Sequence, residues 1–560
     1  MMQSRYKNVM SWLFGFLFLV IAFPVQAQLD IFEKPKNRRP PSNSGGGGFN
    51  FGPISVGGNQ GQKEMQQGGS YYSSGNYAAA SLKYFRVVSQ MSGSRWHPTA
   101  EYQLGKCLYR MGLYHAALDY FTKIIQAGSA HKRFRSSLSW VILISRRLKN
   151  ESMFLGKLRR FKPADFPRKY RDELFYLLGK HYYKNKKLGR ARRLKLAMRL
   201  LRQVQPRRPK FYARAQYIIA IIYDEARDAN NAARAFRRAI ASARRIKNKK
   251  MQKNIMELGV IGLARIHYGA KHFRAAIGYY RLIERNSKRW LDVLFERAWA
   301  HLRRGQFGHT LGLLHTLNSP YFRNEYFPEI GILQSVSFFS RCRYSETKKI
   351  IKKYQRRYKP LANTISAFLR ANKTPLNMFK RLQQLKNQEE TTGLDDNPSD
   401  QMFQRLVKLV FKNKNIRLTY SYIDEITREL SVISQSNVTW RQSSLASTLL
   451  RSLKKERMAK AVLVGKLAQM RLRASYSEVS RLIGEALKIL YETLNAEKDL
   501  LQKSASQRGS FSMRTSRKQK RTLITVAAPE DYVFWPFQGE YWVDELGYYR
   551  YRVRSECHRL

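Results

Sequence analysis

The stretch that decides the fold is residues 100–125, AEYQLGKCLYRMGLYHAALDYFTKII. In its first half, apolar residues recur at i, i+3, i+4 and i+7, which predicts one apolar helix face: Leu104, Cys107, Leu108 and Met111. Gly112 follows and can adopt the left-handed conformation that ends a helix sharply. A second apolar stripe at helical spacing then begins: Tyr114, Ala117, Leu118, Phe121 and Ile125. The stretch therefore predicts two short helices joined by a tight turn.

The residue sizes predict how these two helices pack. Gly105 and Ala117 are small where the helices would cross, and Tyr114 and Phe121 are large where the crossing leaves space. Small against large in an antiparallel helix pair resembles a tetratricopeptide (TPR) repeat. One such pair cannot bury its own apolar face, so this interpretation requires neighbouring copies.

Further copies occur along the chain. The small crossing residues recur at Gly105, Gly179, Ala220, Ala264 and Ala298. The first gap equals about two repeats, and we expect a degenerate copy within residues 137–161. An upstream copy and a looser last copy complete the array: Gly75-Asn76-Tyr77 with Ala80 and Tyr84, and Phe338 with Cys342, Tyr344 and Ile351. An ordinary helical hairpin explains any single copy equally well, but the whole series favours a TPR-like α-solenoid.

Charge limits the partners. The 560-residue chain has 104 Lys+Arg against 39 Asp+Glu, a formal net charge of +65. Such a field bears on partners and solubility rather than on fold. Fourteen Lys or Arg lie between Lys180 and Arg214, and no acidic residue occurs between Glu173 and Asp224. A run of one sign repels itself, which a nearby anion would relieve, although a solvated surface is the alternative.

The first residues predict export. Arg5 and Lys7 precede an apolar run over residues 9–23, and Pro24 and Val25-Gln26-Ala27 follow. This order is typical of a secretory signal peptide cleaved after Ala27. An uncleaved anchor is the alternative, but the run is shorter than the ~20 residues that span a bilayer. No later apolar run is long enough to span one, so we expect no transmembrane span after cleavage.

Composition divides the rest of the chain. Residues 445–502 carry apolar residues at helical spacing, which predicts one or two long amphipathic helices packed within the chain or against another chain. The tail over residues 531–553 is rich in aromatic residues and Val, and predicts a small β-hairpin. We expect it to dock as a cap on the helical body, with carbohydrate or protein contact as the alternative. The expected fold is all-α, with the following parts: signal peptide 1–27, disordered Gly/Pro-rich leader 28–62, TPR-like array 63–360, helical or coiled-coil-like region 361–503, basic flexible linker 504–525, and aromatic β-hairpin element 526–560.

No catalytic or cofactor signature stands out. The sequence lacks HExxH, GxSxG, Walker and Cys-x-x-Cys patterns, so we expect no enzyme activity, cofactor or metal site. Cys107 lies on a predicted core face. Cys342 and Cys557 are then the candidates for a disulfide, which an oxidising compartment would permit.

Three segments carry a second resemblance. FFSRCRY at 338–344, LYETL at 490–494 and GEYWVDELGYY at 539–549 look like envelope TPR proteins of gliding and predatory Gram-negative bacteria, including the adventurous gliding-motility type. The resemblance implies a non-enzymatic periplasmic or outer-membrane-associated scaffold that binds acidic protein partners in an envelope complex, for example a motility complex. It does not account for the excess of basic residues. The main alternative is a binder of an anionic envelope polymer or surface: cell wall, lipopolysaccharide or phospholipid head groups. Nucleic acid is a weaker third option because export separates the protein from most of it.

The expected binding surface is the inner face of the array. In a TPR superhelix the first helix of each pair lines this face. Its groove-facing positions lie one residue, and four to five residues, after the small crossing residue. Basic and aromatic residues recur at these positions, and we expect them to hold acidic, partly apolar segments of a partner. Buried tyrosines and solvated charges are the alternative. The candidate residues are Lys106, Tyr109, Arg110, Lys180, Tyr183, Lys184, Arg265, Tyr268, Trp299 and Arg303.

Overall fold

The computed structural model describes residues 58–128, 130–148, 166–185, 188–322, 325–391, 407–507, 524–526 and 539–557. The expected signal peptide, most of the leader and part of the degenerate copy lie outside these ranges. The described residues are almost entirely helical. They divide into two compact units, one of residues up to Ala215 with Phe411–Leu467, the other of Gln216–Val410 with Ala468–Leu560. The predicted all-α, TPR-like fold is confirmed.

The first unit begins with five consecutive antiparallel helices, each packed on the next, and a further packed helix pair follows them. Gly75 and Gly112 adopt φ of 81° and 83°, the left-handed conformation that glycine tolerates without a steric penalty, and so make the sharp turns. Asn76 caps the helix that follows, accepting a hydrogen bond from the Ala79 amide. The helices are α3 (Gly58–Ser73), α4 (Tyr77–Gln90), α5 (His97–Arg110), α6 (Tyr114–Gln126), α7 (Phe134–Arg147), η3 (Arg168–Tyr170), α9 (Arg171–Lys184), α10 (Arg190–Leu201) and the start of α11 (Pro209–Glu225).

The small crossing residues act as the sequence predicts. A Cβ added at Gly105 would lie 3.0 Å from the Phe121 ring, and one at Gly179 would lie 2.6 Å from Leu201 Cγ. Each glycine therefore lets the two helices of a pair approach closely. The core beneath contains fully buried Leu104, Leu108 and Phe121.

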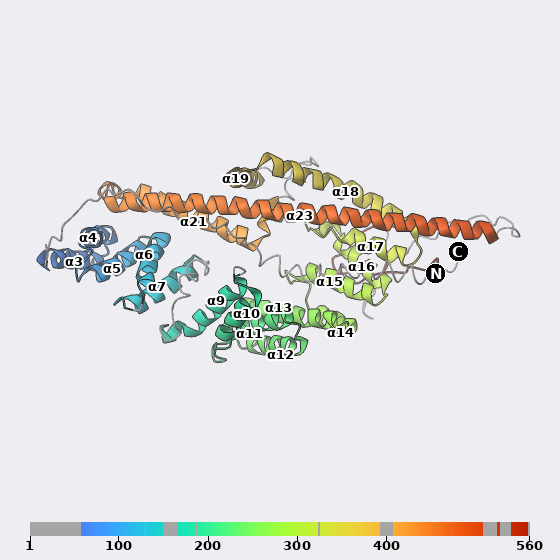
Figure 1. Cartoon of the computed structure of the whole chain (residues 1–560), viewed down its shortest axis with the longest axis horizontal. Helices are drawn as coiled ribbons and strands as arrows, with labels where there is room; N and C mark the ends of the chain where they lie inside the picture. The colour runs from blue at the N-terminus through green and yellow to red at the C-terminus, as the bar shows by residue number, and fades with distance from the viewer. Residues whose placement is uncertain are drawn as a thin grey trace. The chain divides into compact units, whose positions relative to one another are not determined.

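A hairpin from late in the sequence completes the first unit. Helix α21 (Lys414–Gln435) leads through α22 (Val438–Arg441) into the first part of α23 (Ser444–Gln507), and Figure 1 shows α21 and that part of α23 lying alongside each other. The Tyr422 hydroxyl donates to Glu456, and Lys460 lies over the Tyr422 ring, so side chains join the two arms. The Trp440 Nε1 donates to Ser81 Oγ at 2.8 Å, and Trp440 is 2% exposed. The hairpin is thus anchored on α4.

The second unit continues the helical pairs. A Cβ at Gly262 would lie 2.4 Å from the Phe236 ring, so α12 and α13 also cross at a glycine. The core of the next pair joins Ala264, Ala276 and Tyr280. Its helices are the rest of α11, α12 (Ala229–Ala243), α13 (Lys249–Gly269), α14 (Phe273–Arg281), α15 (Trp290–Arg303), α16 (Phe307–Leu317), η4 (Pro320–Phe322), α17 (Ile330–Phe339), α18 (Tyr344–Ala371) and α19 (Pro375–Thr391).

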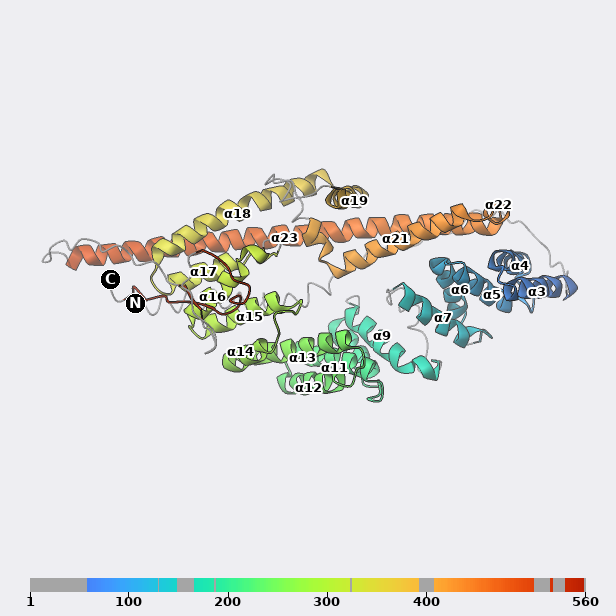
Figure 2. The ribbon, with the colours of Figure 1, turned by 180° about the vertical axis from the view of Figure 1, so that it is seen from behind.

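The later part of α23 belongs to this second unit and runs along α18 (Figure 2). Lys348 pairs with Glu497 at 2.6 Å, and Gln469 Nε2 donates to the Asn372 and Lys373 carbonyls, both at 2.9 Å. The long amphipathic helices expected from the sequence therefore pack within the chain.

The described residues near the C-terminus include two short strands, while part of the segment expected to form a small β-hairpin lies outside the described ranges. β1 (Ile524–Val526) pairs antiparallel with β2 (Tyr549–Tyr551), with Ile524 opposite Tyr551. Among the described residues, the partner of β2 thus lies before the aromatic segment. Local pattern could not reveal this, because pairing between strands so distant in sequence depends on where the tail docks.

The expected boundaries also differ from the helices. Residues 58–62, expected in the leader, lie in α3, and α23 continues to Gln507, past the start of the expected linker. α3 is held by packing that composition does not show, since a Cβ at Gly68 would lie 2.8 Å from the Tyr84 ring and Glu64 pairs with Arg86 at 2.7 Å. α18 also runs through Pro360, where the array was expected to end.

Candidate partner-binding surface

Tyrosines and cations gather on the first helices of three successive pairs in the first unit. We define the tyrosine–cation surface as a set of half-buried and exposed side chains on α3, α5 and α7: Tyr72, Tyr102, Lys106, Tyr109, Arg110 and Trp140. Its α5 members share one helix face because they are three to four residues apart. Three of them are candidates from the sequence: Lys106, Tyr109 and Arg110.

The cations of this surface lie over aromatic rings. Lys106 Nζ is 4.6 Å from the Tyr72 ring centre and 5.9 Å from that of Tyr102, and the Arg110 guanidinium is 6.0 Å from that of Tyr77. A hydrogen bond with Tyr72 raises the pKa of Arg110. Within the described ranges, neither cation forms an ion pair. Both charges are therefore held in place without being neutralised, which is the state that attracts an anion.

The rings support one another. Trp140 Nε1 donates to the Tyr102 hydroxyl at 2.8 Å, and the Tyr109 ring meets the Trp140 ring edge-on at 5.0 Å. Trp140 in turn stacks on Phe121 of the core at 5.6 Å. These contacts fix the aromatic platform from α5 to α7. The sequence interpretation missed Tyr72, Tyr102 and Trp140, although Tyr102 lies one turn before Lys106 and could have been found.

Helix α9 carries the next three candidates in a different arrangement. Lys180 lies over Tyr176 at 5.6 Å, while Lys184 is half-buried at the end of the helix. Tyr183 is only 5% exposed, and Arg193 lies over its ring and donates to its carbonyl. Tyr183 is thus a packing residue, and only the two lysines reach the surface.

In the second unit, Arg265 is already paired. Its guanidinium makes a two-point ion pair with Glu296, whose Oε2 also accepts the Tyr280 hydroxyl at 2.8 Å. Removing one partner of a buried pair is strongly destabilising, so this arrangement is structural. The expectation that Arg265 binds a partner carboxylate is therefore not supported by its contacts.

The remaining candidates are largely packed. Trp299 is 8% exposed, and burial raises the pKa of Tyr268 to about 12. Arg303 lies over Phe273 at 5.6 Å. Tyr268 is half-buried against the core of its helix pair and Trp299 is buried, so the alternative of packed aromatic residues is supported for both. Of the ten candidates, Arg110 on α5 is the exposed one, and the others are half-buried or buried.

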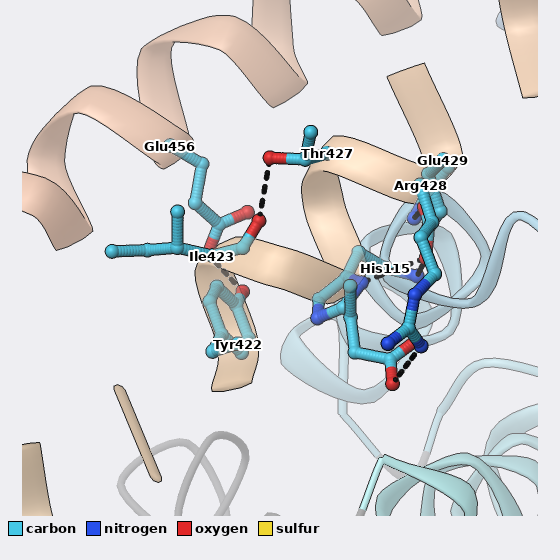
Figure 3. A network of polar contacts seen from close by, with 9 residues as sticks. His115, Tyr422, Ile423, Thr427, Arg428, Glu429 and Glu456 are labelled. Carbon is cyan, nitrogen blue, oxygen red and sulfur yellow. Dashed lines mark hydrogen bonds and ion pairs between the residues drawn. The ribbon is translucent and has the colours of Figure 1, made fainter. Parts of the chain in front are cut away.

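A second polar site anchors the α21 hairpin on the repeats. Glu429 of α21 accepts hydrogen bonds from the backbone amides of His115 and Ala116, at 2.7 and 3.4 Å, and contacts His115 Nδ1 at 2.7 Å (Figure 3). Helix α6 begins after Leu113, which provides no side-chain cap, so Glu429 caps its first turn. The sequence interpretation missed this contact between residues 314 apart. The available signal was a glutamate on an otherwise apolar face of α21.

The C-terminal segment covers helices α15 to α17 in the second unit. Arg297 donates to the Gly547 carbonyl at 3.0 Å, and the Gly547 amide donates to Thr316 Oγ1 at 2.9 Å. His315 stacks on Tyr541 at 4.7 Å, and burial lowers its pKa to about 4. The structure joins Cys342 to Cys557 by a disulfide, with Cα atoms 5.1 Å apart, and leaves Cys107 as a buried thiol. The described part of the tail therefore docks as a cap.

No group of three or more His, Cys, Asp or Glu residues in the described ranges is arranged to hold a metal ion. None of the described helices is both long enough and apolar enough to cross a membrane. What the surface on α5 offers chemically is fixed positive charge beside aromatic rings.

Comparisons with known proteins return TPR folds. No family model matches the sequence, and no curated protein matches it. Similar solved structures include a TPR protein from Parabacteroides merdae, at 11% identity over 53% of this chain and 93% of that one, TM-score 0.24. A thermophilic TPR protein from Thermus thermophilus matches at 16% identity, 43% and 99% coverage, TM-score 0.19. Yeast Tom70 matches at 12% identity, 80% and 96% coverage, TM-score 0.24. These TM-scores are too low to support a structural assignment, and the fold assignment rests on the helix pairs described above.

Proposed function

We propose that this chain is a non-enzymatic TPR-like scaffold that binds acidic, partly apolar segments of protein partners on the tyrosine–cation surface. The observation that supports the proposal is that Lys106 and Arg110 are held on tyrosine rings without an ion-pair partner in the described ranges. A partner carboxylate would meet the cations, and its apolar side chains would lie on the rings.

The proposal extends to location. The basic start, apolar run and small residues before Gln28 are those of an exported protein, and the resemblance to gliding and predatory bacterial envelope proteins supports the periplasm or the outer membrane. In that setting the scaffold belongs to an envelope complex of the motility type.

A second candidate function, binding of an anionic envelope polymer, is supported by α10. Arg192, Lys195 and Arg199 are exposed on this helix at helical spacing. Such a row of one charge suits a phosphate-bearing or carboxylate-bearing polymer, and its binding would weaken steeply with salt.

The test compares two pairs of substitutions in the full chain. Binding of a synthetic peptide with alternating glutamate and leucine, and of polyphosphate, is measured by calorimetry at low and high salt. For the scaffold, Lys106→Ser with Arg110→Ser weakens the peptide about tenfold, while the matched control Arg192→Ser with Lys195→Ser leaves it unchanged. Equal peptide binding by the folded Lys106/Arg110 variant would refute the surface. Loss of polyphosphate binding in the α10 variant alone would favour the polymer binder.

A further inference from the structure

The later part of α23 has a second apolar stripe that faces away from the unit. Its inner face is buried, with Leu482 and Ile489 at 1% and 5% exposed. On the outer face, Leu487, Tyr491 and Leu494 are 49%, 64% and 48% exposed. Single apolar residues on a surface need no explanation, but three large ones in successive turns of one helix form a patch.

The spacing of the stripe is that of a helix–helix seam. Leu487, Tyr491 and Leu494 are separated by four and then three residues, the repeat that keeps one face against a partner helix. The half-buried Ile483 and Leu490 flank this line. The face therefore fits another helix better than an extended peptide or a flat surface.

The stripe is complementary to itself. If two copies cross antiparallel near Tyr491, Leu487 of one copy lies opposite Leu494 of the other, and the same contact repeats by symmetry. Lys498 of one copy then lies opposite the uncharged Gly484 of the other, whereas parallel pairing would set Lys498 against Lys498. The charge pattern therefore favours antiparallel pairing.

The charge of this segment also permits two copies to meet. A chain of net charge +65 repels itself, but residues 485–502 carry four acidic and two basic residues. Glu497 among them is neutralised by Lys348 of its own chain. The stripe thus lies where repulsion between copies is reduced.

We propose that the outer face of α23 around Tyr491 pairs antiparallel with the same face of a second copy, so that the protein forms a twofold-symmetric homodimer. This proposal is independent of the tyrosine–cation surface, which lies in the other unit.

The first test measures mass in solution by light scattering after size exclusion. The wild type is a dimer, and Leu487→Glu with Leu494→Glu is a monomer with an unchanged helical circular dichroism spectrum. Leu282→Glu is the matched control, since Leu282 is 64% exposed and lies outside the stripe, and it remains a dimer. A monomeric wild type at about 100 μM, or a double variant that remains dimeric, overturns the proposal.

The second test determines orientation by cross-linking. Leu487→Cys and Leu494→Cys proteins are oxidised separately and as a mixture, while the native cysteines are in a disulfide or buried. Antiparallel pairing gives a cross-link chiefly in the mixture, between position 487 of one copy and 494 of the other. Cross-linking of each variant to itself would show parallel pairing and overturn the proposed arrangement.

Discussion

Glutamates are scarce in this chain, and several buried ones form an ion pair with an arginine or cap the start of a helix. Glu173 binds Arg146, Glu296 binds Arg265, and Glu429 caps α6. Acidic side chains used in this way no longer balance the surface, so cations such as Lys106 remain uncompensated. The charge excess seen in the sequence is therefore concentrated on the exposed faces.

Glu429→Ala should destabilise the first unit by about 3 kcal/mol, because it leaves two amides of α6 and the His115 ring without their acceptor. Urea unfolding and hydrogen exchange at His115 and Ala116 measure the loss. Glu425→Ala is the control on the same helix: its exposed pair with Arg428 is worth less than about 1 kcal/mol. Equal effects of the two substitutions would contradict the capping role.

Glu329 should make the second unit less stable as pH rises. Burial, aided by Glu478, raises its pKa to about 7, above the unfolded value near 4.5. The folded state therefore keeps the proton longer, and its stability falls between about pH 4.5 and pH 7 and is then constant. Glu329→Gln removes this loss, gaining about 2 kcal/mol at pH 8 after allowance for partial exposure.

The measurement is urea unfolding from pH 4 to pH 8, expressed as the difference between variant and wild type. This difference also cancels the opposite trend of His315, whose lowered pKa makes stability rise with pH between about 4 and 6.5. Glu325→Gln, at an exposed position of the same segment, serves as control. A difference that does not grow toward pH 7 contradicts the assignment.

At the scale of helices, the sequence pattern predicted the features that depend only on neighbouring residues: helix faces, turns and the crossings within a pair. The apolar periodicity around Leu104, the turn at Gly112 and the crossing at Gly105 follow from neighbouring residues, and the structure has all three. The docking of α21 on α6 and of β2 on α16 could not be predicted, since each joins segments more than 200 residues apart. Of the candidate site, the α5 positions were found, but not the pairing that neutralises Arg265.

Gly312→Ala should displace β2 from α16. A Cβ at this position would lie 1.7 Å from the Tyr549 carbonyl oxygen, so the strand must move. We expect a loss of about 2 kcal/mol and faster hydrogen exchange at residues 547–551. Gly278→Ala, at a helical glycine with no atom within 4 Å, is the control and should be neutral or stabilising. Unchanged exchange in the Gly312 variant would mean that the tail does not rest on α16.

At the scale of the whole chain, the composition predicted the fold class but not the division of the chain into two units. The 43% hydrophobic content and the repeats indicated a long helical array, yet the structure divides it into two units, each completed by residues from beyond the array. A boundary of this kind depends on which distant segments pack together, and no stretch near Ala215 marks it. Export, which concerns residues outside the described ranges, stays a prediction.

The Cys342–Cys557 disulfide closes a loop of 215 residues, and both of its cysteines lie in the second unit. A link across so long a loop restricts the unfolded chain and typically stabilises by about 2–4 kcal/mol. Reduction should therefore lower the unfolding midpoint of the second unit and free residues 547–557 to exchange, while the amides of α6 in the first unit keep their protection. Cys557→Ser should reproduce the effect and be insensitive to added reductant, which separates the bond from other actions of the reagent. If reductant destabilises wild type and Cys557→Ser equally, the 342–557 bond is not what holds the tail, and the hydrogen bonds from Arg297 and to Thr316 must suffice.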